Sequence, residues 1–139
     1  MALTVSKFDR SLGYMMAVET DSTNSMNTDV FAGEGKLYSI DIDNISGSNV
    51  CYLKIFLTDY APVVGTDTPD IVLRCPLGVR QVWTVPEGLS FTTCSFVSTL
   101  NPASTDTTAT AGTLAVRLVA STEVIAQKTY SPLIALTTD

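Results

Sequence analysis

The chain has 139 residues, of which 45% are hydrophobic and 16% are charged, and this composition excludes an intrinsically disordered protein. Its 14 acidic and 8 basic residues give a net charge of -6 without any basic cluster, which excludes a surface for phosphate backbones or anionic lipids. No apolar run reaches the roughly 18 residues that a membrane-spanning helix needs. We therefore expect one globular domain over residues 1–139, with no nucleic-acid partner and no membrane partner.

The first half of the chain predicts strands. GYMMAVET (13–20) is the first candidate, and GKLYSIDID (35–43) alternates apolar and polar residues, which predicts that Tyr38, Ile40 and Ile42 face one side. VCYLKIFLTD (50–59) alternates in the same way and presents four residues on one side: Cys51, Leu53, Ile55 and Leu57. We expect these last two runs to form an antiparallel hairpin.

Short strands separated by turn residues continue through the second half, as DIVLRC (70–75), VRQVWTV (79–85), LSFTTCSFVS (89–98) and TLAVRLVAS (113–121). Pro86-Glu87-Gly88 predicts a turn. In VRQVWTV the alternation does not decide whether Val82 or Trp83 faces the core. In the last run Leu114, Val116 and Leu118 are expected to face the core, with Arg117 opposite. Seven to eight short strands predict an all-β fold, an antiparallel β-sandwich or jelly roll.

Two terminal segments extend beyond these strands, an N-terminal arm (1–12) and a C-terminal arm (123–139), while residues 99–113 form a low-complexity linker. Because an apolar segment after the last core strand needs a surface to cover, the C-terminal arm predicts an edge strand or a contact with a neighbouring subunit. The candidate interface residues are Val124, Ile125, Tyr130, Leu133, Ile134 and Leu136.

DIDNISGSN (41–49) begins like a calcium loop, with Asp41 and Asp43 as candidate ligands. Such a loop needs an oxygen ligand at position five, glycine at six and glutamate at twelve, where this chain has Ile45, Ser46 and Tyr52. We therefore expect a turn and no metal or other cofactor.

Catalytic candidates are equally weak. The chain has no histidine, which excludes histidine bases and triads, and Asp59, Asp67 and Asp70 lie in a connecting stretch that predicts a solvated loop. Cys51, Cys75 and Cys94 lack zinc spacing and are expected to be buried and reduced, as in a protein made in a cytoplasm. We expect no enzyme.

GKLYSIDIDN, YLKIFLTD, CPLGVRQVWTVPEGLSF and TLAVRLV, which together span residues 36–119, resemble small virion structural proteins of tailed bacteriophages. These are β-sandwich or jelly-roll proteins that decorate or cement a capsid. The resemblance implies a non-enzymatic protein that is made in the host cytoplasm, forms trimers or dimers, and docks onto the major capsid protein of the virion. The resemblance does not assign a functional residue of that family to any position in this chain.

Two alternatives stay open at this stage. One is a phage tail or head-fibre component. The other is a carbohydrate-binding β-sandwich module that uses Trp83 or a tyrosine as a stacking platform, although core packing is the more common role of such aromatic residues.

Overall fold

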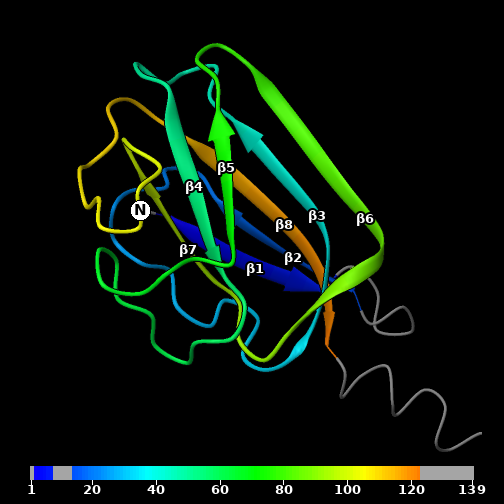
Figure 1. Ribbon diagram of the computed structural model, residues 1–139. Coiled ribbons are helices and arrows are strands. Elements are labelled where there is room, and N and C mark those ends of the chain that lie inside the picture. Colours follow the sequence, from blue (N-terminus) through cyan, green and yellow to red (C-terminus); the bar gives the residue numbers. More distant parts are fainter. Residues whose placement is uncertain (1, 8–13, 123–139) are drawn as a thin grey trace, which may run out of the picture.

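The computed structural model describes residues 2–7 and 14–122, and this part of the chain is all-β, with two antiparallel sheets packed as a sandwich (Figure 1). The larger sheet has five strands in the order β1-β2-β8-β3-β6, and the smaller has three in the order β5-β4-β7. The strands are β1 (Leu3–Lys7), β2 (Tyr14–Glu19), β3 (Gly35–Asp43), β4 (Cys51–Phe56), β5 (Ile71–Cys75), β6 (Arg80–Phe91), β7 (Ser95–Thr99) and β8 (Ala115–Thr122). The predicted fold class is confirmed.

The strand pairs are nested from the ends of the chain inward. β2 pairs with β8, Asn27 forms an isolated bridge with Phe96 of β7, β3 pairs with β6, and β4 pairs with β5. The chain is therefore a long antiparallel hairpin rolled across two sheets, and the pairs β3–β8 and β4–β7 close the roll. This is the connectivity of a jelly roll, with β1 added at one edge.

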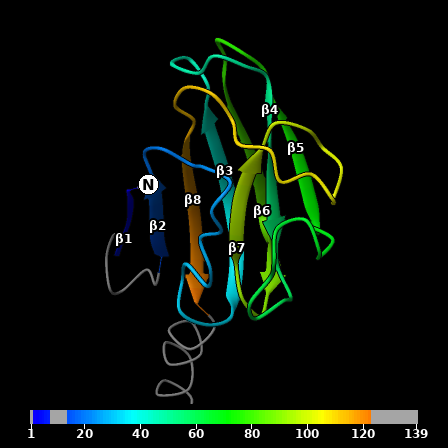
Figure 2. The same cartoon turned by 90° about the vertical axis from the view of Figure 1, so that its left-hand side faces the viewer.

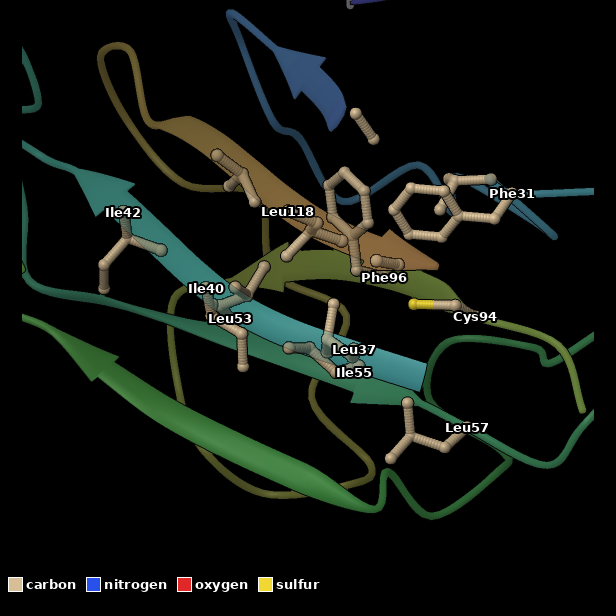
Figure 3. Packing of buried hydrophobic residues seen from close by; sticks show 14 of the residues in the cluster. Phe31, Leu37, Ile40, Ile42, Leu53, Ile55, Leu57, Cys94, Phe96 and Leu118 are labelled. Atoms are coloured by element: carbon tan, nitrogen blue, oxygen red, sulfur yellow. The ribbon is translucent and has the colours of Figure 1, made fainter. Parts of the chain in front are cut away.

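The core fills the space between the two sheets. Figure 3 shows Leu37, Ile40 and Ile42 of β3 facing Leu53 and Ile55 of β4, with Leu118 of β8 beside them. Phe31 and Phe96 extend this cluster toward the end where Cys94 lies. Because each buried aliphatic or aromatic side chain contributes about 2 kcal/mol relative to exposure, this cluster is the main stabilising feature of the fold.

The expected hairpin between residues 35–43 and 50–59 is wrong, because β3 lies in the larger sheet and β4 in the smaller. Between them the buried Asn44 amide donates hydrogen bonds to the carbonyls of Asn49 (2.9 Å) and Cys75 (3.0 Å), which turns the chain from one sheet to the other. Alternation identifies the inward face of each strand but does not identify the strand with which it pairs.

The expected turn at Pro86-Glu87-Gly88 is also wrong, because β6 runs through it. Thr84 lies opposite Ser39 and Leu89 opposite Leu37, so residues 85–88 bulge from the ladder opposite a single residue of β3. Gly88 takes a φ of +79° there, a conformation that glycine adopts without strain. The predicted strand 89–98 is consequently divided between the end of β6 and β7.

β3 has an extra residue of its own at Tyr38, because Leu37 lies opposite Ala120 of β8 while Ser39 lies opposite the adjacent residue Val119, and this bulge changes which residues of β3 face the core. Leu37 is buried and Tyr38 is only half-buried, so the prediction that Tyr38 shares a face with Ile40 is wrong. In β6 the open assignment is resolved in favour of Trp83, which lies opposite Ile40 and packs against the core, while Val82 is exposed.

The other strand predictions are confirmed, including β2 and β5. In β8 and the residue before it, Leu114, Val116 and Leu118 are buried and Arg117 is exposed, as the alternation predicted. The linker between β7 and β8 is a loop without strands.

Candidate interaction surface

The two aspartates of DIDNISGSN lie at the end of β3 and serve local structure. Asp43 Oδ1 accepts a hydrogen bond from the Ile45 N–H (3.0 Å), and Asp41 pairs with Arg80 at 2.6 Å on the solvent side of the larger sheet. An exposed pair of this kind contributes little stability. Within residues 2–7 and 14–122, no three acidic, cysteine or histidine side chains are grouped as a metal site would require.

The aspartates of the connecting stretch 57–70 hold that loop together. Asp67 Oδ2 accepts a hydrogen bond from the Val63 N–H (2.7 Å), and Asp70 Oδ2 accepts one from the Leu57 N–H (2.6 Å). Asp59 lies in the same loop. Because each paired carboxylate is used to fix loop backbone, this arrangement shows structural roles for Asp67 and Asp70.

A hollow of about 390 Å³ opens where the start of β3, the end of β6 and the loop after β4 meet. Glu34 is its single ionisable residue, and the rest of its lining is Gly35, Thr58, Ser90, Phe91 and Thr92. A lone carboxylate among hydroxyl groups gives this hollow no acid pair and no nucleophile with an adjacent base.

The aromatic residues considered for ligand stacking are dispersed. Trp83 lies on the inner side of β6, whereas Tyr14 and Tyr38 contact each other edge to face at 5.6 Å between ring centroids. Tyr60 is exposed in the loop after β4. The structure therefore does not bring Trp83 together with an exposed tyrosine on one binding face.

β1 is exposed on both sides. Val5 lies opposite Ala17, and Ala17 lies opposite Leu118, so Val5 continues a row of core residues on the inner face of the larger sheet. Leu3 is on the same face, yet it is 37% exposed and Val5 is 36% exposed. The smaller sheet has fewer strands than the larger, and Figure 2 shows β1 at the outer edge, on the side away from β4 and β5.

The β1 surface, defined here as the inner-face side chains of Leu3 and Val5 together with the free edge of this strand, can accept another chain. In the described part of the molecule β1 pairs with β2 alone, so one edge of its backbone has no strand beside it. An edge strand with an apolar face suits both burial of side chains and addition of a strand. The sequence analysis assigned residues 1–12 to an N-terminal arm, whereas residues 3–7 form a strand of the larger sheet.

A second exposed apolar group lies at the end of the sandwich where β3 leads into β4 and β5 into β6. The Gly78 N–H donates to the Asn44 carbonyl and the Asn44 N–H donates to the Val79 carbonyl, both at 3.0 Å. These bonds hold two loops together and place Ile45, Leu77 and Val79 at one tip, where all three are exposed. Sequence reasoning missed this group because its members come from two separate turns.

The sequence analysis also did not predict that two charged residues, Glu19 and Lys54, are buried. The carboxylate of Glu19 is fully buried and accepts hydrogen bonds from the Ala2 and Asp21 N–H groups and from the Asn27 amide. Lys54 is buried beneath the loop that precedes β8, where its Nζ donates hydrogen bonds to the carbonyls of Ala103 and Asp106. The six interface residues predicted between Val124 and Leu136 lie outside the described residues.

Comparison of the chain with protein-family models, curated proteins and solved structures gave no match. No helix that is long and apolar enough to cross a membrane occurs in the described ranges.

Proposed function

We propose that this protein is a non-enzymatic structural component of a phage virion, a decoration or cement protein that binds the major capsid protein on the head and also contacts copies of itself. The observation that carries the proposal is the β1 surface, an edge strand with exposed Leu3 and Val5 on a face that elsewhere forms the core. The jelly roll adds support because viral capsid domains use this fold, although lectin domains use it too.

The β1 surface would act by two kinds of contact. A strand from a neighbouring subunit added beside β1 would pair backbone N–H and C=O groups, and its side chains would bury Leu3 and Val5. Each Å² of apolar surface removed from water contributes about 25 cal/mol, of which association costs consume a large part. A single contact would therefore be weak, and many copies on one shell would bind and stiffen it together.

The inward position of Trp83 supports the structural role over the carbohydrate-binding alternative. A stacking platform needs an aromatic face open to the ligand, whereas Trp83 lies opposite Ile40 and packs against the core cluster. A tail or head-fibre component would use the same edge strand, so the place of the protein on the particle separates these two virion roles.

The test uses two substitutions at adjacent residues of β1. Val5→Lys places a charge on the inner face, and Ser6→Lys places the same charge on the opposite face of the same strand. We expect Val5→Lys to weaken binding to heads at least about tenfold, because burying an unpaired charge costs more than about 1.4 kcal/mol, and Ser6→Lys to stay within about twofold.

The measurement is co-sedimentation of purified protein with heads assembled from the major capsid protein of the genome that encodes this chain. Circular dichroism confirms that both variants are folded. Equal binding by the two variants would contradict the role of the β1 surface, and failure of the unchanged protein to bind heads would contradict the decoration role itself.

A further inference from the structure

Cys51 and Cys75 are directly opposite each other on β4 and β5. The Asn27 and Phe96 backbones exchange hydrogen bonds (2.9 and 3.0 Å), so the polar groups of Phe96 point away from β4. Ile55 lies opposite Phe96 and therefore directs its own N–H and C=O toward β5, as does every second residue along β4, including Cys51. Cys51 and Cys75 thus form a hydrogen-bonded pair, in which Cα atoms are about 5.5 Å apart.

That separation is within the range of about 4.4–6.8 Å found between the Cα atoms of a disulfide. Residues opposite each other in an antiparallel ladder have their side chains on the same side of the sheet, and both thiols lie on the core side with Cys51 1% and Cys75 0% exposed. The Cβ atoms of a hydrogen-bonded pair lie about 5.5 Å apart and a disulfide needs about 3.5–4.5 Å, so closure requires the end of β5 to move only about 1 Å toward β4.

The two thiols also differ in acidity. A hydrogen bond from Cys75 lowers the pKa of Cys51, whereas the same bond and burial raise the pKa of Cys75. An unequal pair of this kind provides one sulfur that becomes a thiolate first and a second that keeps its proton. Cys51 is accordingly the attacking sulfur and Cys75 the resolving one.

Access to the pair comes through β5. This strand has five residues and forms the edge of the smaller sheet, and Pro76 follows Cys75 directly, so the ladder cannot continue past it. Local opening of a segment can cost less free energy than global unfolding, and a short strand that is paired on one side only has few bonds to break. Opening of the β5 end would expose Cys75 and Cys51 to a small reagent.

We propose that Cys51 and Cys75 are a redox-active dithiol that closes into a cross-strand disulfide, with a low-molecular-weight disulfide such as oxidised glutathione as the oxidant. The Cys51 thiolate attacks one sulfur of the oxidant, forms a mixed disulfide and releases one thiolate. Cys75 then loses its proton and attacks the Cys51 sulfur, which releases the second thiolate. Two protein thiols are oxidised and one small disulfide is reduced to two thiols.

The disulfide would fasten the edge strand β5 to β4. It closes the chain between residues 51 and 75, which constrains the unfolded state, and we expect the midpoint of thermal unfolding to rise by about 5–10 °C. This inference is independent of the proposed virion role, because it concerns the chemistry of the two thiols alone.

The test treats the folded, reduced protein with oxidised glutathione, quenches with acid, alkylates under denaturing conditions and maps tryptic peptides. Trypsin cuts after Lys36, Lys54, Arg74 and Arg80, so the predicted disulfide joins peptide 37–54 to peptide 75–80. We expect this linked peptide, and a fall from three alkylated cysteines to one, with reversal by a reductant.

Cys94→Ala is the matched control, since Cys94 lies outside the pair, and it should form the same linked peptide. Cys51→Ala should form none and keep both of its thiols. Because the linked peptide is sought in the unchanged protein, the test does not depend on whether a variant folds. Absence of the 37–54/75–80 link after oxidation, or a link that contains Cys94 instead, would overturn the inference.

Discussion

At the residue scale, Lys54 shows that side-chain alternation predicts the face on which a residue lies but not whether that face is buried. The alternation of β4 correctly predicted its inward residues, but it also placed Lys54 on the opposite face, where a lysine would be expected in solvent. Instead Lys54 is buried, because residues 100–113 fold over that face and its Nζ donates hydrogen bonds to the carbonyls of Ala103 (2.6 Å) and Asp106 (3.2 Å). The sequence of a polar loop gives no sign of the strand that it covers.

Replacement of Lys54 by methionine should release this loop. Methionine keeps the length of the apolar stem but removes the donor to the Ala103 and Asp106 carbonyls, of which the Ala103 carbonyl still accepts a hydrogen bond from the Asp106 N–H (3.0 Å). We expect a loss of about 1–3 kcal/mol in the free energy of unfolding. Urea unfolding measures the loss, and faster limited proteolysis within residues 100–113 reports the loop. Lys36→Met, on half-buried Lys36 of β3, serves as control and should change stability by less than about 0.5 kcal/mol.

Cys94 provides a prediction on pH. Burial, with a smaller contribution from the charge of Asp29, raises the pKa of this thiol from 9.0 to about 12. A group with a raised folded-state pKa contributes stability that is complete below pH 9 and is lost as pH rises toward 12. Relative to Cys94→Ala, the unchanged protein should therefore lose stability across that interval.

Alkylation of Cys94 tests the same property at a single pH. At pH 8 its thiolate fraction is about one in ten thousand, so iodoacetamide should modify Cys94 in the folded protein far more slowly than in urea. Equal rates of modification in the two states would contradict the burial of this thiol.

At the element scale, the strands other than β1 could be predicted and most of their partners could not. The inward faces of β4 and β8 followed from period-two alternation, because that pattern depends only on local geometry. The partners of β3 could not be predicted, since it pairs with residues of β6 and β8 that are at least 37 positions away in the sequence. The bulge of β6 opposite Tyr38 contains Pro86 and Gly88, which in the sequence indicated a turn. Local turn chemistry is the same for a hairpin corner and for a bulge.

Gly35, the first residue of β3, tests the closeness of that pairing. A Cβ atom added there would lie 1.9 Å from the backbone oxygen of Ser121 and 3.1 Å from the Phe91 ring. Gly35→Ala must therefore push β3 away from β8, and we expect a loss of at least about 2 kcal/mol in urea unfolding. Ser39→Ala on the same strand should cost less than about 1 kcal/mol, and a similar loss for both variants would show that the clash is relieved.

At the scale of the whole molecule, the chain is a rolled hairpin with one additional strand at its edge. Composition and strand spacing were sufficient to predict a sandwich or jelly roll, because short alternating strands with turn residues between them have few stable arrangements. They could not predict that β1 would remain exposed on both faces, since this depends on the smaller sheet having fewer strands than the larger. The β1 surface could therefore be identified only from the structure. The contacts predicted at residues 123–139 stay predictions.

The most direct test of the proposed virion role is electron cryomicroscopy of virions purified from the source of this gene, which the proposal takes to be a phage. We expect density for the two-sheet sandwich at regular positions on the outside of the head, with β1 against a major capsid subunit or against a second copy. Density on the tail or on a fibre, or virions that lack the protein altogether, would contradict the proposed role as a capsid decoration protein.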